Sequence, residues 1–134
     1  MAPDAVSTRP LLDKLGIKPR AQVAVLDDLG AGFMSLLRER TGDISTRRPR
    51  HKCDVVLMRA ADAASLGRLR EVKQWIKPDG AIWVIRVKGP GARLRDVDLI
   101  DAGLAAGLVD NKIASFSDTE GAMRFVFRLR DRER

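Results

Sequence analysis

The apolar residues of this chain alternate between short strand-like runs and stretches with the period of a helix. The run from Val23 to Leu26 is followed by two carboxylates and then by a turn that holds Gly30 and Gly32. Apolar residues then recur at helical spacing as far as Leu37. The pattern predicts a strand over residues 22–27, a glycine turn, and a helix over residues 31–40. This order places a ligand cleft at the carboxyl edge of the first strand of an open parallel sheet.

The alternation continues along the rest of the chain. Strands are predicted over residues 54–58, 81–87 and 108–116, helices over 63–76 and 95–106, and turns at 77–80 and 117–121. A short helix is predicted at 10–15, and residues 44–46 carry a weak signal for an edge strand. Apolar and polar residues alternate from Met123 to Arg130, which is typical of the second strand of a hairpin.

We therefore predict an α/β fold, a three-layer, mostly parallel Rossmann-like sheet of five or six strands that ends in an antiparallel hairpin. Right-handed crossovers make the first four strands parallel. The domain covers residues 10–130, after a flexible N-terminus (1–9) and before a charged tail (131–134). We expect the last strand at an open edge, where it would pair with a second copy to form a homodimer.

Composition narrows the function classes. A chain of 134 residues that is 45% hydrophobic forms one domain with one core, and its net charge of +7 suits a nucleic acid, an acidic protein or an anionic small molecule. The alternative is a solvated basic surface without a partner. The single cysteine, Cys53, forms no internal disulfide, and no run approaches the roughly 20 apolar residues of a membrane span. We predict a cytoplasmic protein that does not enter a membrane.

Two groups of candidate ligand-binding residues follow from the predicted sheet. Gly30 and Gly32 would let main-chain amides approach an anion at a helix N-terminus, beside Asp28, unless the turn needs glycine only for its conformation. A second group would form an anion-binding rim, because the strands that precede it end at the same edge: Arg59, Lys88 and Arg93. The alternative is that these cations pair with the nearby aspartates.

A third candidate is a basic run that would contact the phosphates of a nucleic acid, and it comprises Arg47, Arg48, Arg50 and Lys52. No aromatic residue lies beside it for base stacking, so a solvated loop is the alternative. His51 and Cys53 have no further ligands nearby in the sequence, and we predict no metal site. The neighbouring cations favour the thiolate of Cys53, whereas its place at the start of a buried strand favours an inert packing role. No nucleophile motif is present, and no catalytic residue is assigned.

The order of elements resembles that of class I S-adenosylmethionine-dependent methyltransferases. Asp28-Leu29-Gly30-Ala31-Gly32 is similar to that family's first cofactor motif. The stretch from Leu69 to Ile85, a helix followed by Lys-Pro-Asp-Gly and a hydrophobic strand, is similar to its Leu-Lys-Pro-Gly-Gly region, and Ala105-Ala106-Gly107-Leu108-Val109 is similar to the Ala-Gly-Phe start of its penultimate strand. The whole chain also resembles an uncharacterised family of small bacterial proteins, a domain of unknown function. That resemblance rests on Lys14-Leu15-Gly16-Ile17-Lys18-Pro19, on residues 78–84, on 107–110 and on Arg124-Phe125-Val126. It implies a shortened methyltransferase-like fold and no known activity.

The departures from the methyltransferase pattern shape our functional expectation. The family's second strand ends in an acidic residue that holds the cofactor ribose, whereas this chain offers Thr46 and two arginines there. Only 21 residues separate Gly32 from Asp54, too few for the family's second and third strands with their helices. We therefore expect a non-catalytic, degenerate methyltransferase-like module that binds or regulates an unknown partner and holds no cofactor. The alternatives are a small S-adenosylmethionine-binding methyltransferase and a nucleic-acid-binding protein.

Overall fold

A computed structural model of the chain describes residues 10–132, and all structural statements below refer to that range. Its regular elements, in chain order, are α2 (Leu11–Lys14), β1 (Val23–Val25), α3 (Ala31–Arg40), β2 (Ile44–Ser45), β3 (Cys53–Arg59), α4 (Ala63–Leu66), α5 (Leu69–Val72), the 3₁₀-helix η1 (Lys73–Trp75), β4 (Ile76–Val87), the 3₁₀-helix η2 (Gly89–Gly91), α6 (Asp96–Ala105), β5 (Leu108–Ser115), β6 (Glu120–Phe127) and the 3₁₀-helix η3 (Leu129–Asp131).

The strands form one six-stranded sheet in the order β2-β1-β3-β4-β6-β5. The first four strands are parallel, and β6 runs antiparallel to both β4 and β5. The predicted fold class is confirmed, including the hairpin at the end of the chain. The weak signal at residues 44–46 corresponds to the two-residue strand β2, which pairs with β1.

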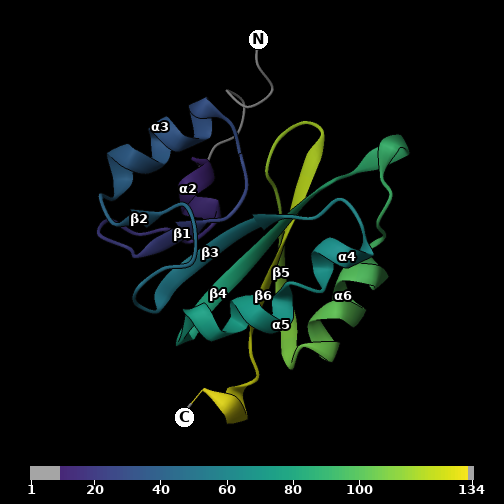
Figure 1. The fold of residues 1–134 in the computed structure, drawn as a ribbon. Helices are drawn as coiled ribbons and strands as arrows, with labels where there is room; N and C mark the ends of the chain where they lie inside the picture. The colour runs from purple at the N-terminus through teal and green to yellow at the C-terminus, as the bar shows by residue number, and fades with distance from the viewer. Residues whose placement is uncertain (1–9, 133–134) are drawn as a thin grey trace.

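Helices cover the two faces of the sheet unequally (Figure 1). On one face, α2 with its C-cap residue Leu15 and α3 pack through Leu12, Leu15 and Leu37 onto β1, β3 and β4. On the other face, α4, α5 and α6 form a core with β3, β4, β5 and β6, and β1 contributes to this core with Ala24. Since seven residues without a helix join β2 to β3, that second face has no covering helix beneath β2.

Three sequence predictions are corrected by the structure. The helix expected over residues 63–76 is divided into α4, α5 and η1, with a break at Gly67. The turn expected at residues 77–80 belongs to β4, because Ile76 pairs with Cys53 across a register shift and draws this segment into the sheet. The last strand, β6, is not at an edge: it lies between β4 and β5, so the edge position belongs to β5.

The structure describes none of the predicted N-terminal segment and only part of the charged tail, so the predicted domain limits stay a prediction. The flexible N-terminus predicted at residues 1–9 lies outside the described residues, and of the charged tail the structure describes Asp131 and Arg132. The Nε of Arg132 donates a hydrogen bond of 3.0 Å to the carbonyl of Phe127. Among the described helices, none has the length and apolar character needed to cross a membrane.

Candidate functional site

The glycine turn joins the carboxyl end of β1 to α3. Gly30 has a φ of 95° and is the N-cap residue of α3, a conformation that L side chains rarely adopt. The Asp28 carboxylate accepts a 2.9 Å hydrogen bond from the Gly30 amide, which closes the turn. Gly32, in contrast, lies inside the first turn of α3 and is exposed. Of the two candidate glycines, Gly30 therefore shapes the turn, whereas Gly32 leaves the start of the helix open to approach.

A hollow of about 340 Å³ lies beside this turn, at the carboxyl ends of β1 and β2. Ligand pockets of proteins are typically about 300–1,000 Å³, so the hollow reaches the lower end of that range. From α3, only Met34 and Arg38 line it. The first backbone N–H groups of that helix, which have no intrahelical acceptor, follow shortly after the lining residue Leu29 in the chain, and no acidic side chain occupies the first turn. Its lining comprises residues 25–29, Met34, Arg38 and Thr46.

The two aspartates after β1 have different roles. Asp27 accepts a 2.8 Å hydrogen bond from the backbone N–H of Arg59 and forms an ion pair of 3.2 Å with Arg68. It therefore ties the end of β1 to β3 and to the residue before α5. Asp28 is exposed, and its only described side-chain contact within residues 10–132 is the one with Gly30. Asp28 is thus the exposed carboxylate at this turn, whereas Asp27 is held in internal contacts.

The three residues of the predicted anion-binding rim are only partly brought together. Arg59 forms two 2.9 Å hydrogen bonds with the Glu120 carboxylate and a further one with the Asp28 carbonyl. Arg93 is exposed and shares a hollow of about 180 Å³ with Arg59. Lys88 lines a different hollow and donates a 3.0 Å hydrogen bond to the hydroxyl of Ser115. Arg59 is therefore engaged in an ion pair within the protein, and Lys88 lies at a different hollow from Arg59 and Arg93.

Arg86, which interrupts the apolar strand β4, has the partners that a largely buried cation requires. Its guanidinium is ion-paired with the Asp96 carboxylate and donates a 2.6 Å hydrogen bond to the Leu94 carbonyl. The side chain is only 15% exposed. Arg86 therefore anchors the loop between β4 and α6 to the sheet.

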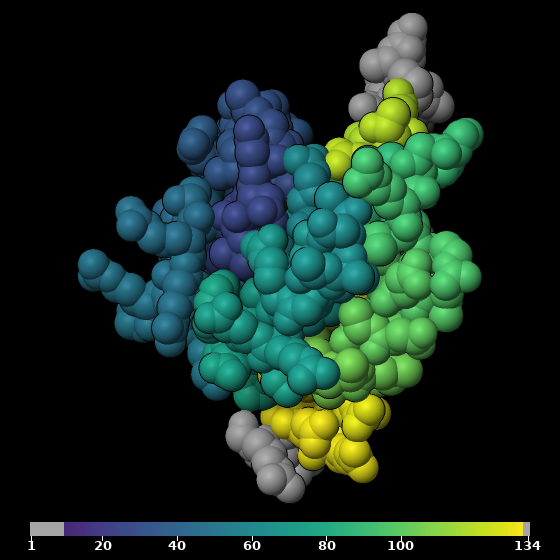
Figure 2. Space-filling view, turned by 45° about the vertical axis from the view of Figure 1, so that its right-hand side comes forward, coloured from purple at the N-terminus to yellow at the C-terminus, as the bar shows by residue number. Residues whose placement is uncertain are grey.

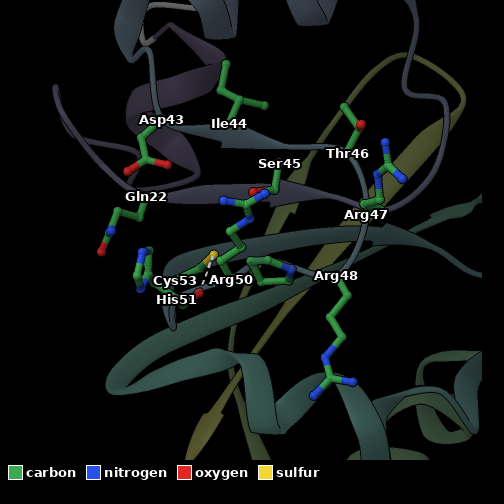
Figure 3. A pocket seen from close by; sticks show the side chains of 11 residues that line it. Gln22, Asp43, Ile44, Ser45, Thr46, Arg47, Arg48, Arg50, His51 and Cys53 are labelled. Carbon is green, nitrogen blue, oxygen red and sulfur yellow. Dashed lines mark hydrogen bonds between the residues drawn. The ribbon is translucent and has the colours of Figure 1, made fainter.

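The basic run follows β2 and forms the rim of a second, larger cavity of about 650 Å³ (Figure 3). The lining of this groove includes the polar residues Gln22 and Ser45 and the buried Cys53, and its rim includes Arg47, Arg48 and Arg50. Lys52 is exposed beside it but does not line it. Thr46 lines both the groove and the smaller hollow, so the two cavities meet at the end of β2.

Cys53 is less acidic than its basic neighbourhood suggested. Burial, together with the charges of Asp43 and Asp54, raises the pKa of this thiol from 9.0 to about 11. The expectation that nearby cations favour its thiolate is therefore wrong, since the thiol is 3% exposed and packs in the core. Within residues 10–132, His, Cys, Asp and Glu side chains form no group of three that could hold a metal ion.

Sequence reasoning missed three residues that line the smaller hollow. Met34 and Arg38 lie one helical turn apart on α3, so their spacing of four residues after the glycine turn was the available signal. Thr46 was noted only as the residue that replaces a carboxylate, and its position between the two cavities depends on the pairing of β2 with β1.

The fold is shared with solved structures of low sequence identity. One is CalO1, a methyltransferase of calicheamicin biosynthesis with S-adenosylhomocysteine bound, at 15% identity and a TM-score of 0.60 over 88% of this chain. Another is LepI in complex with S-adenosylmethionine, at 14% identity and 0.63 over 92%. A third is a putative methyltransferase from Thermoplasma acidophilum, at 12% identity and 0.56 over 84%. Neither a protein-family model nor a curated protein sequence matches the chain.

These likenesses establish a methyltransferase-like fold for a chain that spans 52% of CalO1, 48% of LepI and 70% of the archaeal protein. They also overturn the leading functional interpretation. A non-catalytic module without a cofactor was expected because the chain between Gly32 and Asp54 is short. CalO1 and LepI, which share the fold, were solved with S-adenosylhomocysteine and S-adenosylmethionine bound, which favours the small methyltransferase kept as an alternative. The reason for the error is that β2 and the hollow at the end of β1 persist despite the short connection.

Proposed function

We propose that this chain binds S-adenosylmethionine in the hollow at the carboxyl end of β1 and acts as a small methyltransferase domain. The observation that carries the proposal is the hollow itself, which is lined by the exposed Asp28 and lies at the chain segment that leads into the positive-φ Gly30 and the N-terminus of α3. The fold supports the same proposal, since CalO1 and LepI were solved with this cofactor or its demethylated product.

The residues at the hollow suit a sulfonium amino acid better than a nucleotide phosphate. S-adenosylmethionine carries a sulfonium and an ammonium, and the Asp28 carboxylate stabilises positive charge, whereas it would repel a pyrophosphate. The amides at the start of α3 provide donors for the cofactor's carboxylate. An ideal Cβ at Gly30 or Gly32 meets no atom within 4 Å, so the main chain there is open to approach.

The other side of the hollow suits an adenosyl group. Leu26 and Met34 provide apolar surface for a purine, and the hydroxyl of Thr46 is a donor and acceptor for ribose where the family has a carboxylate. When bound, the cofactor supplies an electrophilic methyl group. The protein's part is to bind and orient that group. The chain spans about half the length of CalO1 and LepI.

Calorimetric titration with S-adenosylmethionine and S-adenosylhomocysteine tests the proposal. The wild-type chain should bind both compounds with micromolar affinity. Met34→Trp fills the hollow and should weaken binding by more than about tenfold, or about 1.4 kcal/mol. Leu36→Trp is the matched control, because Leu36 lies on the same helix but is 48% exposed and does not line the hollow.

Two outcomes would contradict the proposal. Absence of binding to the wild-type chain at millimolar cofactor would reject it outright. Equal affinity of the Met34→Trp and Leu36→Trp variants for the cofactor would show that it binds outside the hollow. Circular dichroism on both variants separates loss of binding from loss of fold.

A further inference from the structure

The cations of the loop between β2 and β3 differ from the ion-paired cations elsewhere in the described chain. Arg59 is ion-paired with Glu120, Arg68 with Asp27, and further pairs involve Arg40, Lys77, Arg86 and Arg95. In the part of the chain that the structure describes, no ion pair involves the basic loop, which we define as Arg47, Arg48, Arg50 and Lys52. All four side chains are exposed. The fold thus leaves four neighbouring positive charges uncompensated at one place.

The groove beneath the basic loop is a consequence of the short connection. Seven residues span β2 to β3 without a helix, so the loop itself borders a cavity of about 650 Å³ on the sheet. Figure 3 shows Arg50 lying over the groove near Ser45 and His51, while Arg47 and Arg48 point in opposite directions. In the space-filling view, side chains of the blue segment around residues 45–52 project from the body of the molecule (Figure 2).

The chemistry of the lining selects an anionic occupant with many acceptor oxygens. Arginines, Gln22, Ser45 and Thr46 supply donors, and Asp43 is the one carboxylate among the lining residues. Protein interfaces have a more apolar core that is rich in aromatic residues. No aromatic ring other than that of His51 lines the groove, and its apolar lining is limited to Ile44, Pro49 and the buried Cys53. A phosphate-bearing occupant therefore fits better than a protein surface.

We propose that the basic loop and its groove bind the sugar-phosphate backbone of a nucleic acid without reading its sequence. The charges are spread along an exposed loop instead of converging on one buried point, which suits successive phosphates of a strand better than a single phosphate group. Without aromatic platforms, base stacking contributes little, so phosphate contacts and salt dependence dominate. This proposal goes beyond cofactor binding and does not depend on it.

Fluorescence anisotropy with a labelled 20-nucleotide RNA, measured without S-adenosylmethionine, tests this proposal. If the basic loop contacts about four phosphates, affinity for single-stranded RNA should fall about 50-fold between 50 and 200 mM salt. Arg48→Glu/Arg50→Glu should weaken binding at least tenfold and roughly halve the salt slope. Arg70→Glu/Arg130→Glu, exposed arginines outside the groove, makes the same change in net charge and should weaken binding less than threefold.

Comparison of the two double variants and competition with other anions distinguish a nucleic acid from other ligands of the groove. An equal loss of affinity in the two double variants would overturn the proposal, because binding would then follow net charge alone. Displacement of RNA by inorganic phosphate or a mononucleotide at micromolar concentration would assign the groove to a small phosphate ligand and overturn the proposal that it binds a nucleic-acid strand. Tighter binding of poly-glutamate than of RNA at equal salt would assign it to an acidic protein instead. Thermal unfolding of every variant shows that the fold is retained.

Discussion

The contact between α6 and the sheet depends on the absence of a side chain at Gly103. A Cβ atom at this position would lie 2.4 Å from Cε1 and 2.6 Å from Cδ1 of Phe125. Phe125 is fully buried in β6, so its ring has no free space to move into. Gly103 lies within α6 and does not have a positive φ, which means that close packing, and not backbone conformation, requires glycine.

The expected cost of Gly103→Ala is the difference between two effects. Alanine favours the helix by about 1 kcal/mol over glycine. Overpacking a rigid core costs about 1–3 kcal/mol, so the net loss of unfolding free energy should be about 1 kcal/mol. Gly103→Val adds two further carbons and a branched Cβ, and its loss should reach about 3 kcal/mol. For a domain of this size, 1 kcal/mol lowers the Tm by about 4 °C.

Urea unfolding monitored by tryptophan fluorescence provides the measurement. Gly32→Ala is the matched control, because Gly32 also lies in a helix but a Cβ there meets no atom within 4 Å, so this variant should gain up to about 1 kcal/mol. In the Gly103→Ala background, Phe125→Leu should cost less than in the wild type, since it removes the clashing ring. If Gly103→Ala were stabilised as much as Gly32→Ala, the packing argument would be refuted.

Two other predictions concern buried polar groups. The pKa of Cys53 is raised to about 11 in the folded chain, so the neutral buried thiol makes its full contribution to the free energy of unfolding below pH 9. The free energy of unfolding then falls by up to about 2–3 kcal/mol between pH 9 and 11, because the unfolded chain ionises first. Urea titrations at pH 7, 9 and 10.5 should show this decline in the wild type and a smaller one in Cys53→Ala; parallel declines would contradict it. Thr41 is 3% exposed and its hydroxyl donates a 2.7 Å hydrogen bond to the Ala21 carbonyl, so Thr41→Val should cost about 1–2 kcal/mol. The exposed control Thr119→Val should change stability by less than about 0.5 kcal/mol, and equal effects of the two variants would argue against that hydrogen bond.

Local sequence signals predicted the long helices well and the middle of the chain less well. Residues 31–40 and 95–106 were predicted as helices and match α3 and α6, because apolar periodicity and the glycines at their ends act locally. At residues 77–80 the same local signals predicted a turn, whereas this segment is part of β4. Gly80 is needed there because a Cβ would lie 2.9 Å from the Cys53 carbonyl, and this close approach of two strands depends on a register that distant residues determine.

The position of β6 and the geometry of the site depend on longer-range effects. An alternating strand is compatible with an edge, yet β6 inserts between β4 and β5, and no local pattern specifies that order. The pairing of Asp27 with Arg68 joins residues 41 positions apart in sequence. The glycine turn and the basic run were visible in the sequence. That the two cavities meet at Thr46 follows only from the pairing of β1 with β2.

Amide chemical shifts of the ¹⁵N-labelled chain report whether the hollow beside α3 is a cofactor site. On titration with S-adenosylhomocysteine, we expect saturable shifts of the Gly30, Ala31 and Gly32 amides and of Thr46, while the amides of β5 stay unchanged. Shifts absent at millimolar ligand, or confined to residues away from the end of β1, would contradict it.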